Sequence, residues 1–171
     1  MANRYYLDEV FDSKYGNCVF ISHQKNDKEV AKKIADYISK SGIDIYFDEY
    51  DQSINRDDPN SVVSAIKTGI RRSTHMLCIL SPNALLSKWM PWEIGYGYDR
   101  LNVTGLTVKE LSKSILPEYL QIVPVLRGTK TLNDYISKAI GREESVLIKE
   151  QKLFSASAQR HPLDDVLDWQ R

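Results

Sequence analysis

Three short apolar runs in the first half of the chain have the length and composition of buried β-strands. They cover residues 17–22, 43–47 and 74–80, and each is bounded by polar segments. Apolar runs of about four to eight residues are too short for a helix and are typical of strands inside a sheet. Two further strands are expected at residues 119–126, where Pro124 indicates an edge position or a bulge, and at residues 145–148.

The segments between these runs have apolar residues at helical spacing. The stripe that predicts the first helix consists of Val30, Ile34 and Ile38. Asn26 and Glu29 have the spacing of a capping box at its start, and Gly42 is expected to end it. Further helices are expected from Pro59, over residues 89–101 and over residues 132–139. Residues 102–118 are polar, with weak helical spacing, and no helix or strand is predicted there.

Alternation of strands and helices predicts an α/β domain with a parallel sheet of about five strands and helices on both faces. We expect a single domain over residues 1–171, with a core at about 15–150, a short N-terminal extension and a C-terminal tail. Ligands of such folds bind outside the carboxyl ends of the strands. Ser22 and His23, Asp48 with the loop that follows it, and Ser81 are therefore expected at one edge of the sheet.

Composition excludes several classes of protein. The 171 residues include 23 Lys and Arg and 23 Asp and Glu, so the net charge is zero and general nucleic-acid binding is not expected. No apolar run approaches the roughly 20 residues that cross a bilayer, and the first residues lack the apolar segment of a secretory signal. Cys18 and Cys78 lie within apolar runs, which favours buried, reduced thiols in a cytoplasmic protein.

Familiar site motifs are absent from the sequence. There is no phosphate-binding G-x-x-x-x-G-K-[ST] motif, and Gly95 and Gly97 lie in a predicted helix without the third glycine of a dinucleotide-binding turn. The acidic segment from Asp51 has Arg56 where a calcium loop requires glycine. The three histidines have no metal-site spacing with the cysteines. No metal and no cofactor are expected.

The most informative stretch is Ser87 to Gly97. On a helix, Trp89 and Glu93 are four residues apart and share a face, which Tyr96 continues. A carboxylate beside aromatic rings is partly desolvated, and such rings can stack on a flat heterocycle or stabilise a cation. The alternative is that Trp89 belongs to the core and Glu93 is a solvated surface residue.

These residues, in this order, resemble a Toll/interleukin-1 receptor (TIR) domain of the bacterial, enzyme-like type. The resemblance covers roughly residues 17–126. It rests on the segments Val19–His23, Gly42–Asp48, Ile66–Ser73, Leu80–Asn83 and Ser87–Glu93, the last with the pattern S-x-W-x-x-x-E. It implies a flavodoxin-like, three-layer fold in which the long loop at residues 48–60 follows the second strand.

The resemblance also implies an activity. Enzymes of this family cleave NAD+ between nicotinamide and ribose, with the glutamate of that motif, here Glu93, as catalytic residue and the tryptophan, here Trp89, in the nicotinamide site. NAD+ is then a substrate and not a cofactor. Bacterial members often act in Thoeris-type antiphage defence, where they convert NAD+ into a cyclic ADP-ribose isomer that activates a downstream effector, and a freestanding chain of this size resembles those signal-producing members. Pro91 and Trp92 depart from the residues that many members carry, which bears on the shape of the pocket.

Other side chains are weaker candidates for substrate binding. They are Ser22, His23, Asp48, Ser87, Trp92 and Tyr96. For His23 the alternative is an exposed loop residue, for Asp48 a strand-terminating turn, and for Ser87 a helix cap. Self-association through the loop at residues 48–60 is expected from the resemblance. Alternative functions are a non-enzymatic TIR interaction module, a plain NAD+ hydrolase and a nucleoside deoxyribosyltransferase-like enzyme.

Overall fold

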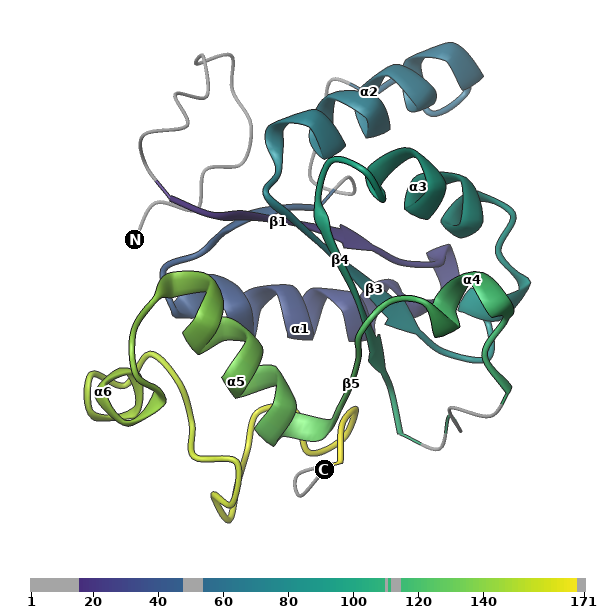
Figure 1. The fold of residues 1–171 in the computed structure, drawn as a ribbon. Helices are drawn as coiled ribbons and strands as arrows, with labels where there is room; N and C mark the ends of the chain where they lie inside the picture. Colours follow the sequence, from purple (N-terminus) through teal and green to yellow (C-terminus); the bar gives the residue numbers. More distant parts are fainter. Residues whose placement is uncertain (1–15, 48–53, 110, 112–114, 169–171) are drawn as a thin grey trace.

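A five-stranded parallel sheet forms the centre of the molecule (Figure 1). The structure, a computed structural model, describes residues 16–47, 54–109, 111 and 115–168. The strand order is β2-β1-β3-β4-β5. The strands are β1 (Cys18–Ser22), β2 (Asp44–Tyr46), β3 (His75–Leu80), β4 (Asn102–Thr107) and β5 (Val125–Arg127). This order is one of the two common arrangements of doubly wound α/β folds, so the predicted fold class is confirmed.

Helices cover both faces of the sheet (Figure 1). The longer ones are α1 (Lys28–Lys40), α2 (Pro59–Arg72), α3 (Trp89–Gly97) and α5 (Gly128–Ile140). Shorter pieces are α4 (Glu118–Gln121), α6 (Glu144–Lys149) and the 3-10 turns η2 (Lys25–Asp27) and η4 (Ala84–Leu86). One core contains side chains of α1, α5 and α6, and the other contains side chains of α2, α3 and α4.

Alternation along β1 decides which residues meet which helices. Val19 and Ile21 lie in the core beside α1 and α5, whereas Cys18 and Phe20 lie in the core beside α2 and α3. Successive side chains of a strand point to opposite faces. Ser22 therefore projects on the same face as Cys18 and Phe20, toward α3.

The first three predicted strands and the first helices are confirmed, with one error at a helix start. Asn26 does not cap α1: a 3-10 turn precedes that helix, and Asp27 occupies the N-cap position. Asp58 caps α2 by accepting a hydrogen bond from the backbone N–H of Asn60, with Pro59 at the first helical position, as the sequence predicts.

The second half of the chain differs from the sequence prediction in three places. Residues 102–107, to which no element was assigned, form β4, which pairs with both β3 and β5. Residues 119–126, expected to be one strand, are divided between α4 and the short edge strand β5. Residues 145–148, expected to be a strand, lie in α6.

The sequence of β4 hides its buried position. Thr104 and Thr107 are buried although polar, and Thr107 donates a hydrogen bond to the carbonyl of Leu126. Gly105 has no side chain, and a Cβ there would lie 2.7 Å from Cδ1 of Leu80. Polar residues and a glycine in one strand weaken the hydrophobic pattern from which strands are predicted.

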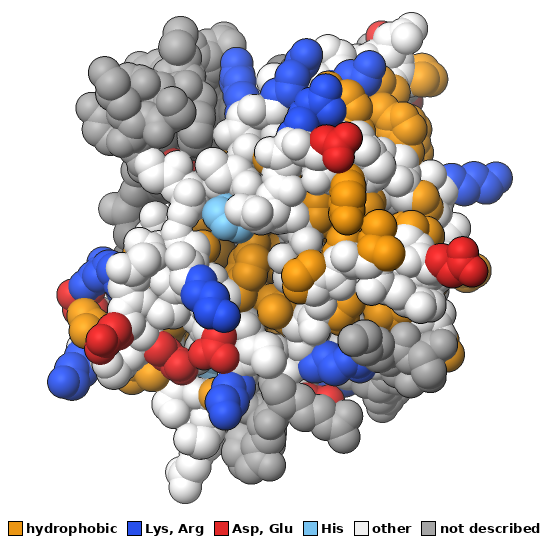
Figure 2. All heavy atoms as spheres, viewed as in Figure 1, with side chains coloured by type: hydrophobic (Ala, Val, Ile, Leu, Met, Phe, Trp, Pro, Cys, Tyr) orange, Lys and Arg blue, Asp and Glu red, His pale blue; other side chains and the backbone are white. Residues whose placement is uncertain are grey.

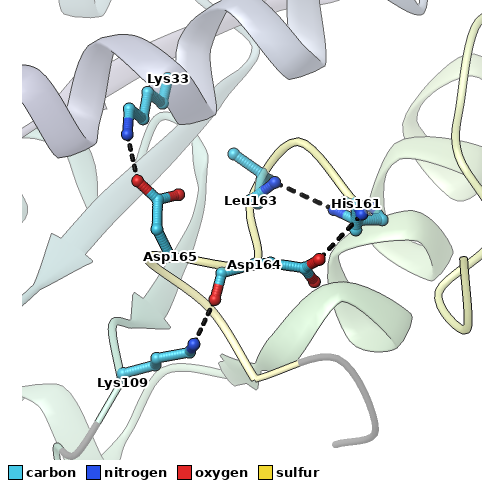
Figure 3. A network of polar contacts seen from close by, with 6 residues as sticks. All are labelled: Lys33, Lys109, His161, Leu163, Asp164 and Asp165. Carbon is cyan, nitrogen blue, oxygen red and sulfur yellow. Dashed lines mark hydrogen bonds and ion pairs between the residues drawn. The ribbon is translucent and has the colours of Figure 1, made fainter. Parts of the chain in front are cut away.

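The C-terminal segment folds back onto the domain. Leu163, Val166 and Leu167 are buried in the core beside α1 and α5. Polar contacts hold the same segment in place, among them an ion pair of Lys33 with Asp165 and a hydrogen bond from Lys109 to the Asp164 carbonyl (Figure 3). Within the described part of the chain, no helix is long and apolar enough to cross a membrane.

Candidate active site

The candidate site lies where α3 meets the C-terminal ends of β1 and β3. α3 approaches the sheet closely because Gly97, one turn after Glu93, carries no side chain. A Cβ on Gly97 would lie 2.7 Å from Cε of Met76 on β3. The buried face of α3 includes Met90 and Ile94, which fixes the rotation of the helix and places Glu93 toward the end of β1.

Glu93 is buried in this junction. Its side chain is 8% exposed, and its Oε2 accepts a hydrogen bond of 2.5 Å from Oγ of Ser22. A buried carboxylate requires polar partners, and the hydroxyl at the end of β1 is one of them. The interpretation of Glu93 as a solvated helix residue is wrong.

Trp89 has the opposite environment. Its side chain is 46% exposed, so the alternative that it belongs to the core is also wrong. Its ring packs edge-on against Trp92 at a centroid distance of 5.8 Å, and Trp92 stacks on Tyr96 at 5.7 Å. The three rings form one continuous aromatic row along α3.

Basic side chains flank the end of this row. The guanidinium of Arg100 lies 4.6 Å from the centroid of the Tyr96 ring, and the Lys67 ammonium lies 5.6 Å from the same centroid. Figure 2 shows basic side chains over α2, next to a hydrophobic surface over α3. Cations against an aromatic face are attracted by its negative potential, so these contacts steady Tyr96.

Ser87 caps α3. Its Oγ accepts hydrogen bonds of 3.2 Å from the backbone N–H groups of both Trp89 and Met90. Pro91 lies in the first turn of the helix, where its missing N–H has no helical acceptor to lose. The cap interpretation of Ser87 is therefore confirmed, and a role in binding substrate stays a prediction.

The ring of His23 lies against that of Phe47 at the same edge of the sheet. Its ring stacks on Phe47 with centroids 4.5 Å apart and an interplanar angle of 11°. The residue is half-buried, so it is not the exposed loop histidine of the alternative. Asp48 follows Phe47 directly but lies outside the described residues, so its predicted role is not examined by the structure.

Ser81 makes structural hydrogen bonds at the same edge of the sheet. Its hydroxyl donates to Oδ2 of the buried Asp27 at 2.5 Å and accepts from the N–H of Ala84 at 2.9 Å. Asn83 donates to the other oxygen of Asp27 at 3.2 Å. These bonds tie the segment after β1 to the segment after β3.

Three residues of this region were not predicted from the sequence to belong to a site: Asp27, Phe47 and Cys78. Cys78 is fully buried and is the cross-strand partner of Ser22 in the register of β1 and β3. Burial and the negative charge of Glu93 both raise the pKa of its thiol. Pairing the predicted parallel strands in register is the signal that could have found it. Both cysteines are free and buried, as predicted.

The described side chains form no group of three or more His, Cys, Asp or Glu that could hold a metal ion. The chemically distinctive feature of the site is the buried carboxylate of Glu93, one helical turn from the exposed Trp89. A fixed anion of this kind stabilises positive charge that develops beside it.

Comparison with known proteins identifies relatives of this chain. A family model described as TIR domain matches residues 19–137. A protein of Escherichia coli O6:H1 (strain CFT073), named NAD(+) hydrolase TcpC, is 32% identical over 99 residues, which cover 57% of this chain. The match spans only 29% of the length of that relative.

Solved structures share the fold at low sequence identity. The TIR domain of the Toll-related receptor TRR-2 from Hydra magnipapillata has a TM-score of 0.51 at 12% identity, covering 77% of this chain and 95% of that domain. A TIR-STING receptor from C. gigas, solved in complex with 2',3'-cGAMP, has a TM-score of 0.56 at 21% identity, covering 80% of this chain and 42% of the receptor.

Proposed function

Because the chain belongs to the TIR domain family, we propose that it cleaves NAD+ at the bond between nicotinamide and ribose, with Glu93 as the catalytic carboxylate. The observation that carries the proposal is the reversed burial of two neighbours on α3: the carboxylate of Glu93 is buried and the indole of Trp89 is exposed. The name of the E. coli relative, an NAD(+) hydrolase, supports the same substrate.

The proposed reaction needs no strong acid. The nicotinamide ring of NAD+ is already cationic, so when the bond between its N1 and the ribose C1' breaks, the electron pair neutralises the ring. C1' is left with the character of an oxocarbenium ion, as in glycoside hydrolysis. The negative charge of Glu93, fixed in a poorly hydrated position, interacts most strongly with that cation and so lowers the barrier.

The aromatic row along α3 supplies the complementary surface. The exposed indole of Trp89 offers a flat apolar face to the nicotinamide ring. Trp92 packs against this indole, and Tyr96 in turn stacks on Trp92. Substrate contacts of His23, Asp48, Ser87, Trp92 and Tyr96 belong to the same proposal.

The product depends on the nucleophile that reaches C1'. Water gives ADP-ribose and releases a proton to the solvent. A ribose hydroxyl of the same molecule gives a cyclic isomer with loss of the hydroxyl proton. A ring nitrogen of the adenine, which carries no proton, gives one whose positive charge is neutralised when the exocyclic amino group loses a proton. A substrate folded in the site supplies its own nucleophile at high effective concentration, so the proposed product is a cyclic ADP-ribose isomer. The proposal extends to a signalling role, in which a downstream effector reads this product in antiphage defence.

The proposal includes self-association through residues 48–60, in which a neighbouring subunit completes the active site. Residues 54–58 are described and lead into the cap of α2 at Asp58, whereas residues 48–53 are not. A site completed by a neighbouring subunit loses activity on dilution. Activity per subunit that stays constant over a broad dilution series contradicts this part of the proposal.

Product analysis tests the proposed function. The protein is incubated over a range of concentrations with NAD+ and, separately, with a nucleoside plus a free base, and the products are separated by chromatography and weighed by mass spectrometry. Nicotinamide with a cyclic isomer supports the full proposal, and nicotinamide with ADP-ribose supports hydrolysis alone. Base exchange without NAD+ cleavage indicates a deoxyribosyltransferase-like enzyme. No turnover of either substrate indicates an interaction module.

A further inference from the structure

Ser22 occupies a position that suits orientation of Glu93 better than contact with a substrate. It is the last residue of β1 and is 1% exposed, so it presents almost no surface to a ligand. Its hydroxyl has one proton, which it donates to Oε2 of Glu93. A hydrogen bond to a charged oxygen is stronger than one between neutral groups, and it fixes the direction of the carboxylate.

Cys78 is the cross-strand neighbour of Ser22. The two residues are paired in the parallel register of β1 and β3, and both are buried. Burial, reinforced by the charge of Glu93, raises the pKa of the Cys78 thiol. The thiol therefore keeps its proton and adds no second negative charge beside Glu93.

We infer that Ser22 is a positioning residue for Glu93, whose hydrogen bond holds the carboxylate in one direction. The inference rests on the proposed function for its catalytic consequence. Its structural part, that Ser22 sets the orientation of Glu93, stands on the geometry of β1 and α3.

A second serine–cysteine pair in the same sheet provides a matched control. Cys18 Sγ and Ser73 Oγ are 3.6 Å apart, and Ser73 donates to the carbonyl of Gly69 at 2.8 Å. Both are buried, but Cys18 begins β1 and Ser73 precedes β3, at the opposite end of the strands from Ser22 and Cys78. Truncation of this pair removes similar buried atoms without touching Glu93.

The kinetic test compares Ser22→Ala with Ser73→Ala. Loss of a hydrogen bond to a charged group lowers kcat for nicotinamide release about 10- to 100-fold in Ser22→Ala, with KM little changed. In Ser22→Ala the acidic limb of the pH–rate profile moves to higher pH. Ser73→Ala changes stability alone.

A second measurement does not depend on turnover. The carboxyl carbons of the glutamates are labelled with 13C, the Glu93 signal is identified by its loss in Glu93→Gln, and its titration is followed by NMR. In Ser22→Ala the Glu93 titration moves to higher pH, and in Ser73→Ala it does not. An unmoved Glu93 titration in Ser22→Ala overturns the inference whatever the enzyme does. A moved titration in a protein that leaves NAD+ intact supports the positioning role and defeats the proposed function.

Discussion

Trp89 and Glu93 lie one turn apart on α3, and each has the environment typical of the other: Trp89 is 46% exposed and Glu93 is 8% exposed. Tryptophan is usually well buried, and glutamate is rarely buried without a partner. Folding alone does not favour either arrangement, because exposure of the indole forgoes hydrophobic stabilisation and burial of the carboxylate costs desolvation. A site that binds a flat cationic substrate accounts for both.

Truncation of the exposed indole separates function from stability. We expect Trp89→Ala to lower kcat/KM for NAD+ about tenfold or more, because a stacking surface is lost. The free energy of unfolding changes by about 1 kcal/mol or less, since much of the ring already faces solvent. Steady-state kinetics and chemical denaturation give the two values. Leu86→Ala is the control, because Leu86 precedes α3 and is 84% exposed. Equal effects of the two changes on kcat/KM would remove Trp89 from the site.

Two glycines in helices are expected to respond in opposite directions to replacement by alanine. In Gly69→Ala on α2, the new Cβ would lie 2.5 Å from Cε1 of Tyr46. That ring is buried, stacks on Phe20 and donates to the Ala65 carbonyl, so it cannot yield easily. In Gly95→Ala on α3, the new Cβ meets nothing within 4 Å.

The stability of these two variants, measured by chemical denaturation, checks the packing of α2 and α3. Gly69→Ala loses about 1–2 kcal/mol, because overpacking outweighs the gain in helix propensity. Gly95→Ala gains about 0.5–1 kcal/mol from that propensity alone. A stabilised Gly69→Ala protein would show that Tyr46 does not pack against α2 as described.

His161 makes the attachment of the C-terminal segment sensitive to pH. Leu163 N–H donates to its Nδ1 at 3.1 Å, as Figure 3 shows, so the ring proton of the neutral form lies on Nε2. That nitrogen is 3.2 Å from the hydroxyl of Tyr37, whose pKa burial raises to about 12. Burial lowers the pKa of His161 below its usual 6.5, and the charge of Asp164 opposes this in part.

The sign of the pH effect follows from that shift. When the pH falls below about 6.5, the unfolded chain takes up a proton at His161 before the folded chain does, so folding stability falls with the pH. We expect this loss in denaturation curves measured between about pH 8 and about pH 5. His161→Ala loses about 1–3 kcal/mol at neutral pH and has a flatter pH dependence. The lowered pKa of His75 gives a residual slope of the same sign in both proteins. An unchanged slope in the variant would exclude His161 as the group responsible.

How far the sequence predicts the fold depends on how strongly each segment is patterned. The first and third strands are short apolar runs, the second alternates around Asp44, and α1 and α2 have regular apolar stripes, so the pattern identifies them. β4 is missed because Thr104, Gly105 and Thr107 are buried without being apolar. Residues 145–148 form a turn of helix whose Leu147 is buried in the core, and a segment with only three apolar residues in a row does not distinguish helix from strand.

The candidate site is predicted in outline from local spacing and missed where it depends on pairing between distant segments. The spacing of Trp89 and Glu93 places them on one side of a helix, and Ser22 follows a recognisable strand. The pairing of Cys78 with Ser22 depends on the register of β1 against β3, and the stacking of Phe47 on His23 joins two segments that are distant in sequence. Neither is encoded in a short stretch of sequence.

The rate of nicotinamide release by Glu93→Gln tests the central claim most directly. The amide has the shape of the carboxylate and keeps an oxygen that can accept the hydrogen bond from Ser22, so the fold is preserved and only the negative charge is lost. We predict release at least about 100-fold slower than in the wild-type protein, with an unchanged unfolding midpoint measured on the same sample. Release at the wild-type rate by the folded variant would contradict the assignment of Glu93 as the catalytic carboxylate.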